Sequence, residues 1–180
     1  MTNPNAAPPS ISTLPTPLGD MILACTPKGV SGLWFMGQAH FPPEVLHWPQ
    51  VEVHHPQQKM HSLAQEQVLD YFIGQRRSFE LPIDLTARGT EFEKDVWGAL
   101  QNIPWGQKIS YGELAKQLNR PLAARAVGAA VGKNPISLIV PCHRVCGANG
   151  ALTGYAGGLD KKAFLWTLES ANASPSLGAS

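Results

Sequence analysis

The sequence predicts an α+β protein, with a small antiparallel sheet domain in its first half and an all-helical helix-turn-helix domain in its second. Short apolar runs separated by Pro and Gly fill the first half, whereas apolar residues at helical spacing follow from residue 90. The 180 residues are 43% hydrophobic and 15% charged, a composition that suits one compact domain or two small ones. The change of pattern places the domain boundary between Asp84 and Gly89, which gives domains at 18–85 and 86–170.

Both ends of the chain are predicted to be disordered. Residues 1–17 are rich in Pro, Asn, Ser and Ala, and residues 171–180 are rich in Ser, Ala, Gly and Pro. Such segments bury too little apolar surface to offset the entropy of ordering them. We expect neither tail to carry chemistry.

The first strands form a predicted hairpin. Met21–Thr26 and Val30–Met36 are apolar runs joined by a Pro-Lys-Gly turn, which is the pattern of two antiparallel strands. The Pro- and His-rich stretch His40–Pro56 is read as a loop, and Ser78–Ile83 is expected to return to the sheet.

A helix is predicted between that loop and the last strand. Ser62 and Gln65 form a capping-box pattern that would open it, and Gly74 suits its end. Its apolar face is expected to consist of Ala64, Val68 and Tyr71 or Phe72.

The second half begins with another capping box. Thr90 and Glu93 stand three residues apart, and the apolar positions that follow predict a helix up to the break at Pro104. Those positions are Phe92, Val96, Leu100 and Ile103.

Two short helices joined by a tight turn come next and resemble a helix-turn-helix. Ser110 and Glu113 cap the first of them, and the second runs from Leu122 to about Gly132. Small residues dominate this second helix, so it can either approach a surface closely or pack closely against a neighbouring helix. These residues are Ala123, Ala124, Ala126, Gly128, Ala129 and Ala130.

Composition and charge exclude several classes of protein. No apolar run approaches the roughly 20 residues of a membrane helix, and the Pro-rich start lacks the charged and apolar regions of a signal peptide. Three cysteines are too few for a disulfide framework, so a reducing, cytoplasmic setting is expected.

Residues 1–85 carry 4 basic and 7 acidic side chains (net −3) and residues 86–180 carry 10 and 6 (net +4), which sum to the +1 of the chain. The second half is therefore the candidate for binding a polyanion.

The stretch from Asn134 to Val145 has the densest set of reactive side chains. Cys142 follows a buried, strand-like run and is next to His143 and Arg144. A free thiol is only a few per cent thiolate at neutral pH, so a nucleophilic cysteine needs such a base or positive charge beside it. A small core cysteine beside a surface histidine is the alternative, and for an isolated Cys-His pair it is the commoner one. A metal site with Cys146 is disfavoured, because the Cys-His-x-x-Cys spacing has no second pair nearby.

Several short motifs, taken together, resemble one known family. They are Pro141-Cys-His-Arg-Val145, Arg125-Ala-Val-Gly128, Asn134-Pro135 and Gly154-Tyr-Ala-Gly-Gly-Leu159. In this order and spacing they look like the O6-alkylguanine-DNA alkyltransferases, and the likeness covers about Gly89 to Glu169 closely. It implies a ribonuclease H-like domain followed by a winged-helix-like domain.

The resemblance implies direct-reversal DNA repair in which each molecule acts once. The thiolate of Cys142 would take the alkyl group from O6-alkylguanine, or from O4-alkylthymine, and keep it as a thioether. His143 would accept the thiol proton through a bound water, and Glu169 would orient the imidazole. Asn134 would tie the recognition helix to the active-site turn, and Arg144 would be structural.

The resemblance also implies how DNA is bound. A monomer without a cofactor would place its recognition helix in the minor groove of double-stranded DNA with alkylated bases. Arg125 would replace the rotated base in the stack, and Tyr111 would help the purine leave. Ala124, Ala126, Gly128 and Ala129 would allow close approach without reading the sequence. The base pocket would be formed by Cys142, Val145, Leu152, Tyr155 and Ala156.

Some residues depart from the family pattern. Trp105, Glu93 and Cys146 differ from the commoner residues but lie outside the expected chemistry, and Cys146 is read as a buried structural thiol. The only cysteine in the first half is Cys25, so no zinc site is expected there. The range of adducts is open, because Ser137 lies where the pocket wall varies within the family.

Three other functions compete with this interpretation. A lesion binder of the alkyltransferase-like group lacks the nucleophile, whereas Cys142 is present here. An alkylation-sensing regulator would need a further cysteine-rich domain. A cysteine hydrolase would need an oxyanion hole, which the sequence does not indicate.

Overall fold

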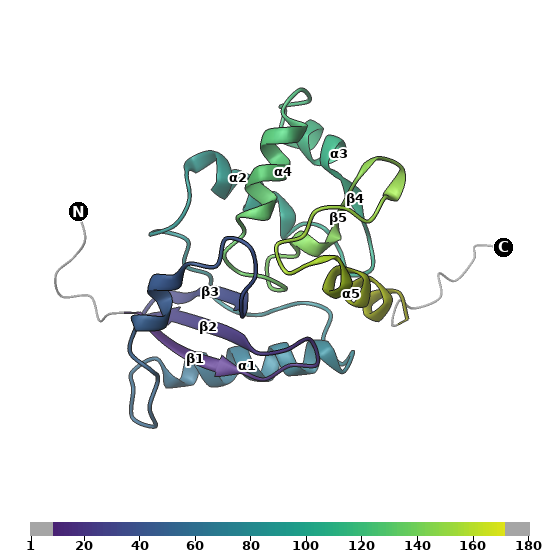
Figure 1. Cartoon of the computed structure of the whole chain (residues 1–180). Helices are drawn as coiled ribbons and strands as arrows, with labels where there is room; N and C mark the ends of the chain where they lie inside the picture. Colours follow the sequence, from purple (N-terminus) through teal and green to yellow (C-terminus); the bar gives the residue numbers. More distant parts are fainter. Residues whose placement is uncertain (1–8, 172–180) are drawn as a thin grey trace.

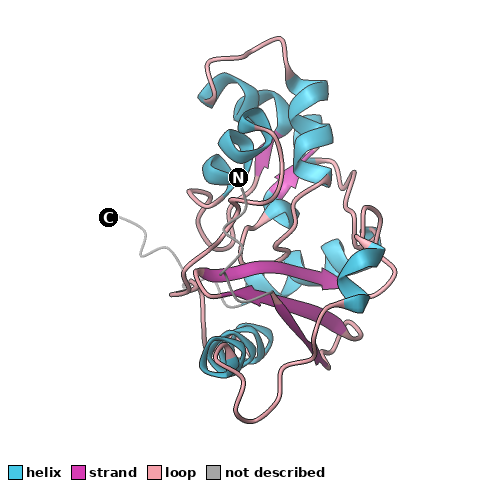
Figure 2. Ribbon diagram, turned by 90° about the vertical axis from the view of Figure 1, so that its left-hand side faces the viewer, coloured by secondary structure: helices cyan, strands magenta, loops and turns pink. Residues whose placement is uncertain are grey.

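The first half of the molecule is an antiparallel sheet covered by a helix. The computed structural model describes residues 9–171, in which the strands are ordered β1-β2-β3. Figure 1 shows α1 lying along the sheet and the helices of the second half beyond β3, the strand at one edge, and Figure 2 shows the molecule turned by 90°. The elements are β1 (Ser10–Leu14), β2 (Met21–Thr26), β3 (Gly29–Phe35), the 3-10 helix η1 (Pro43–His47) and α1 (Gln58–Phe72).

Both faces of the sheet are buried, because side chains alternate along each strand. Leu23 and Phe35 belong to a large apolar core that includes one face of α1. Ile22 and Trp34 point the other way, into a smaller cluster with Val45 of η1. The predicted hairpin is therefore confirmed as β2 and β3.

The prediction of disorder over 1–17 is wrong for Ser10–Leu14. This segment pairs with β2 along its whole length, from Ser10 opposite Cys25 to Leu14 opposite Met21. Backbone pairing orders a segment that is too short and too rich in neighbouring prolines to show a strand pattern of its own. Residues 1–8 and 172–180, for which we also predicted disorder, lie outside the described residues.

Two further predictions for the first half need correction. Helix α1 begins at Gln58, four residues before the expected cap at Ser62, and no side chain caps its start. Ser78–Ile83 does not form a strand: only Ile83 bridges to Val30 at the edge of β3. Gly74 does follow the end of α1, with the positive φ of 74° that favours glycine.

The second half is mainly helical. Both predicted capping boxes are present, at Thr90 with Glu93 and at Ser110 with Glu113. Helix α4 (Ala124–Gly132), the expected recognition helix, begins two residues later than predicted. Strands β4 and β5 form a short parallel pair that was not predicted. The elements are α2 (Glu91–Leu100), β4 (Ile109–Ser110), α3 (Tyr111–Gln117), α4 (Ala124–Gly132), η2 (Cys142–Arg144), β5 (Val145–Cys146), η3 (Ala148–Gly150) and α5 (Leu159–Ala171).

The two halves share one apolar core. A single cluster of buried residues contains side chains from both, among them Leu33, Val68, Val127 and Val140. The segment that leads to Cys142 runs beside β3, where Leu33 N–H donates to Pro135 O and Ser137 N–H donates to Leu33 O. The sheet therefore supports the backbone that carries the reactive residues. None of the helices in the described residues is both long and apolar enough to cross a bilayer.

Candidate active site

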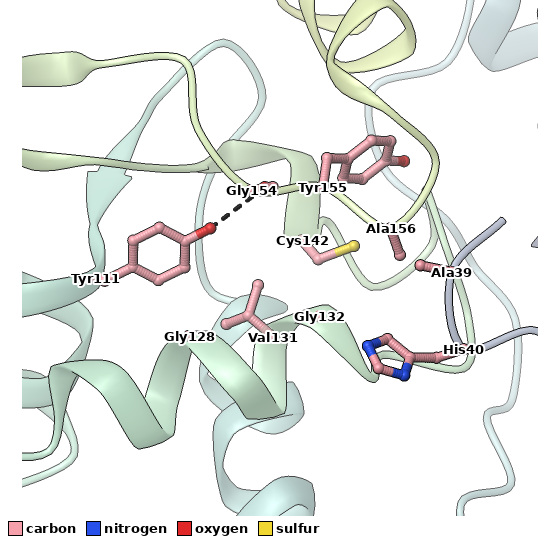
Figure 3. Close-up of a pocket in the computed structure, with 10 residues that line it drawn as sticks. All are labelled: Ala39, His40, Tyr111, Gly128, Val131, Gly132, Cys142, Gly154, Tyr155 and Ala156. Carbon is pink, nitrogen blue, oxygen red and sulfur yellow. Dashed lines mark hydrogen bonds between the residues drawn. The ribbon is translucent and has the colours of Figure 1, made fainter.

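Cys142 lies at a cavity between the recognition helix and the loop at residues 154–156. The cavity has a volume of about 220 Å³, and the side chain of Cys142 is only 4% exposed. Figure 3 shows its sulfur directed into the space between Tyr155 and Ala156 on one side and α4 on the other. The lining residues are Ala39, His40, Tyr111, Gly128, Val131, Gly132, Cys142, Gly154, Tyr155 and Ala156.

Asn134 fixes the turn that presents the thiol. It follows the end of α4, and its side-chain N–H groups donate to Val140 O at 2.8 Å and to Cys142 Sγ at 3.0 Å. Its Oδ1 accepts the backbone N–H of Ile136 at 3.0 Å. The helix and the active-site turn are thus joined by one buried amide, as the resemblance implied.

The thiol is kept protonated at rest. Burial raises the pKa of Cys142, although the hydrogen bond from Asn134 and the charge of Lys162 lower it. Transfer chemistry at this sulfur therefore requires a base that can take its proton.

His143 is placed to act as that base. It is fully buried, and its Nε2 lies 2.8 Å from Glu169 Oε1. Burial lowers the pKa of His143, against the opposing effect of Glu169, so the imidazole is neutral and donates its Nε2 proton to the carboxylate. Its Nδ1 is buried and has no hydrogen-bond partner among the described residues, so a lone pair is free to accept a proton.

Glu169 is held as a carboxylate by several donors. Arg144 donates from Nε at 3.0 Å to Oε2 and from a terminal N–H group at 2.9 Å to Oε1, and Gly106 N–H donates to Oε2 at 3.0 Å. Burial raises the pKa of Glu169, but the bonds and charges of His143 and Arg144 outweigh it and lower the pKa to about 2. Arg144 also donates to Ile103 O, so it has the structural contacts that we expected.

Lys162 places a positive charge beside the thiol. Its side chain is completely buried, and its ammonium group donates to the backbone carbonyls of Val145, Thr153 and Gly154. Burial lowers the pKa of Lys162 to about 8, although the nearby Cys142 and Cys146 raise it. The lysine therefore connects β5 to the loop that borders the cavity.

Tyr111 forms the side of the cavity nearest the start of α3. Its hydroxyl donates to Gly154 O at 3.3 Å, a bond drawn in Figure 3. A Cβ at Gly154 would lie 2.8 Å from that hydroxyl oxygen, and the φ of Gly154 is 51°, so a larger residue there would displace the tyrosine.

The recognition helix presents a face of small residues next to the cavity. Arg125, Ala126 and Ala129 are exposed, and Leu122 in the preceding turn is fully exposed. Gly128 is half-buried against the Tyr111 ring, and Ala124 packs partly against the core. This pattern agrees with a surface that another molecule approaches closely.

Two of the expected pocket residues do not line the cavity. Val145 is fully buried and its carbonyl accepts from the Lys162 ammonium, and Leu152 is exposed in the segment before Thr153. Tyr155 and Ala156 do line it. Cys146 is buried and bonds to Ile109 O rather than facing the cavity. Ser137 is buried behind the wall, 3.5 Å from Gln38.

The sequence analysis missed three contributions to the site. Tyr71 had been assigned to the apolar face of α1, but its hydroxyl donates to Glu169 Oε1 at 2.9 Å. Nothing in the sequence indicated that Lys162 is buried at the site, because a lone lysine usually lies at the surface. Ala39 and His40 come from a loop of the first half, and Ala39 N–H donates to Ala156 O at 2.9 Å. Within residues 9–171 no group of His, Cys, Asp and Glu side chains could hold a metal ion.

Protein-family models match both halves of the chain. The ribonuclease-like domain of 6-O-methylguanine DNA methyltransferase matches residues 11–85, and its DNA binding domain matches residues 91–171. A methylated-DNA–protein-cysteine methyltransferase of Mycobacterium tuberculosis is 43% identical over 161 residues, which cover 89% of this chain and 92% of the relative. One from Methanosarcina acetivorans is 56% identical over 106 residues, 59% of this chain and 67% of the relative.

Solved structures of O6-methylguanine methyltransferases are also similar to this chain. The crystal structure of Mycobacterium tuberculosis O6-methylguanine methyltransferase has a TM-score of 0.80 and 41% identity, covering 94% of this chain and 97% of that one. Mycobacterium tuberculosis OGT in complex with DNA has a TM-score of 0.79 and 40% identity, covering 92% and 96%.

Proposed function

The chain belongs to the 6-O-methylguanine DNA methyltransferase family and repairs DNA by direct transfer of an alkyl group to a cysteine, and we propose that this cysteine is Cys142. One observation carries the assignment. Cys142 Sγ borders a cavity while it accepts a bond from Asn134, and the neighbouring His143 keeps an unpartnered, buried Nδ1. A buried polar atom without a partner is costly, which supports a catalytic role for it.

The reaction follows from these contacts. His143 Nδ1 takes the proton of the Cys142 thiol, through a water molecule, while Glu169 stabilises the imidazolium. The thiolate sulfur then attacks the alkyl carbon, the S–C bond forms, and the C–O6 bond breaks with its electron pair moving to the guanine. The guanine gains one proton in place of the alkyl group, which balances the proton that the thiol gave to His143 and that the imidazolium then releases. The thioether is stable. Each molecule therefore acts once.

The transition state is supported by fixed charges. The positive charge of Lys162 and the N–H group of Asn134 both favour the thiolate over the thiol. Because Glu169 already neutralises Arg144, the buried ammonium of Lys162 supplies net positive potential at the sulfur.

The exposed face of α4 supports binding in the DNA minor groove. Ala126 and Ala129 have no side chains that could read base edges, so little dependence on sequence is expected. Arg125 is exposed near the start of the helix, where its side chain can fill the gap left by a rotated nucleotide. Tyr111, at the cavity mouth, is positioned to meet the base as it enters.

We further propose that the protein acts as a monomer on alkylated duplexes, in a cytoplasmic, reducing compartment that keeps Cys25, Cys142 and Cys146 as free thiols.

The cavity supports a substrate range beyond methyl. Ser137 is small and lies behind the pocket wall, so we expect removal of methyl and of somewhat larger groups from guanine O6, and slower removal from O4-alkylthymine. Single-turnover rates for methyl, ethyl and benzyl lesions measure this range, and removal of methyl alone would contradict it.

The direct test is the intact mass of the protein after incubation with a duplex that carries O6-methylguanine. We expect a gain of one methyl group, located on Cys142 by peptide mapping and saturating at one per protein. Cys146→Ser should behave as the wild type, and Cys142→Ser should bind the lesion without gaining mass. A protein that binds the lesion without any gain of mass is a damage sensor instead.

Arg125 is tested by comparing two substrates. Because only a duplex requires base rotation, Arg125→Ala should slow repair of duplex DNA by at least about tenfold but leave the reaction with free O6-alkylguanine nearly unchanged. Lys94→Ala, on helix α2, is the control for a general loss of positive charge. Equal losses on both substrates would remove the proposed role of Arg125.

A further inference from the structure

Tyr71 brings a polar group from the N-terminal half into the reactive centre. It lies on α1, is completely buried, and donates its hydroxyl hydrogen to Glu169 Oε1 at 2.9 Å. The hydroxyl oxygen of Tyr71 also lies 3.3 Å from His143 Nε2. Packing alone explains a phenylalanine at this position, but not a buried hydroxyl directed at the His143–Glu169 pair.

Aromatic neighbours hold the tyrosine ring from several sides. It stacks on Phe79 with centroids 5.6 Å apart, and it meets Trp105 edge-on at 5.1 Å. Trp105 in turn donates its indole N–H to the backbone carbonyl of Glu169 at 2.9 Å. The hydroxyl is therefore fixed relative to the carboxylate by rigid rings rather than by a mobile chain.

The hydroxyl completes the set of donors around one carboxylate oxygen. Oε1 of Glu169 accepts from Tyr71, His143 and Arg144, and Oε2 accepts from Arg144 and Gly106. Burial and the adjacent Glu169 raise the pKa of Tyr71 well above its usual value, so this group remains a donor. These donors keep Glu169 ionised, and an ionised carboxylate can only accept hydrogen bonds, so it holds His143 through the Nε2 proton and leaves the Nδ1 lone pair available.

We propose that Tyr71 is a positioning residue for alkyl transfer, because its hydroxyl fixes Glu169 and thereby the tautomer of His143. A residue of the N-terminal half thus completes the set formed by Cys142, His143 and Glu169 in the C-terminal half. The proposal rests on the roles proposed above for His143 and Glu169. The other titratable groups around this pair are Arg144, Lys162, Cys142 and Tyr155. All of them remain in place in the variants that test it.

Tyr71→Phe keeps the ring and removes only the hydroxyl. The single-turnover transfer rate at saturating duplex should fall about tenfold, the size expected for loss of one hydrogen bond to a charged group. With one donor fewer, Glu169 acts more strongly on His143 and raises the pKa of His143, so the variant should need a higher pH to reach its maximal rate. DNA affinity should not change.

Val68→Ala is the matched control, because it weakens the packing of the same helix one turn earlier without touching Glu169. It should lower the thermal midpoint but leave the pH midpoint of the rate unchanged. Phe79→Ala keeps the hydroxyl but loosens the ring. We expect a smaller loss of transfer rate than in Tyr71→Phe, and a pH midpoint of the rate that shifts in the same direction. It also tests the proposal if Tyr71→Phe does not fold.

Glu169→Gln separates this proposal from the proposed function. If Tyr71 acts through Glu169, Tyr71→Phe should lower the transfer rate much less in the Glu169→Gln background than in the wild type. A full tenfold loss in both backgrounds, or a folded Tyr71→Phe with the rate and pH profile of the wild type, overturns the role of Tyr71. Failure of the proposed function is recognised differently, because the wild-type protein would then gain no methyl group on Cys142.

Discussion

Each half of the molecule contains a completely buried histidine, and the two differ in how their ring nitrogens are satisfied. His61, on α1, has partners on both sides: Ser10 Oγ lies 3.0 Å from Nε2 and Ser12 Oγ lies 2.7 Å from Nδ1. His143 has Glu169 at Nε2 but no partner at Nδ1 among the described residues. Burial lowers the pKa of both rings, so both are neutral at neutral pH.

The difference separates a structural histidine from a reactive one. His61 joins β1 to α1 through two serine hydroxyls, and Gln65 adds a bond to Ser12. A ring with both nitrogens satisfied has no site left for chemistry. His143 gives up one favourable hydrogen bond and so keeps a lone pair available beside Cys142.

The largest effect that this comparison predicts is on transfer. His143→Gln should slow methyl transfer by about 10²- to 10⁴-fold, the usual contribution of a positioned base. His61→Gln should change the rate by less than about twofold in protein that remains folded. Quench measurements of single-turnover transfer test both variants, and a comparable loss in His61→Gln would end the distinction.

The same contrast shows what could be predicted from the sequence. Thr90 and Ser110 were recognised as caps because a capping box involves residues only three apart. Cys142 and His143 were recognised because they are adjacent within a dense motif. Their roles, and that of Glu169, came from the resemblance.

Contacts that depend on folding could not be predicted. The Tyr71 hydroxyl reaches a carboxylate 98 residues further along the chain, so its sequence neighbours indicate only an apolar helix face. Strand β1 was missed because its order comes from pairing with β2, and the start of α1 was misplaced because Gln57 offers no side-chain cap. Lys162 was missed because its partners are backbone carbonyls, which carry no residue-specific signal.

The next effect concerns stability in acid. The pKa of His61 is lowered from 6.5 to about 4 in the folded protein, so the neutral ring stabilises the fold fully above pH 6.5. As the pH falls from 6.5 to 4, the unfolded chain takes up the proton first, and the free energy of unfolding should fall by on the order of 3 kcal/mol. Urea titrations across this range should show a shallower slope for His61→Gln.

The lowered pKa of His143 contributes in the same direction, so some slope should remain in His61→Gln. Glu169 adds a separate loss at lower pH, between about 4.5 and 2, because its folded pKa is about 2 and its carboxylate stabilises the fold above that window. Identical slopes for the wild type and His61→Gln would show that the serine-bound histidine does not control the first window.

The smallest effect addresses the premise of the comparison, namely that an unpartnered buried nitrogen is costly. Ser12→Ala removes the partner of His61 Nδ1 and so leaves the ring in the state of His143. We expect a loss of about 1 kcal/mol in the free energy of unfolding, measured in urea, with no change in transfer. Ser31→Ala is the matched control, because Ser31 is a buried serine on β3 whose Oγ has no hydrogen-bond partner among the described residues, and its removal should cost nothing.

If Ser12→Ala proved equally neutral, an open imidazole nitrogen would be inexpensive to bury in this fold. The bare Nδ1 of His143 would then no longer indicate a base, and its role would depend on the transfer rates alone.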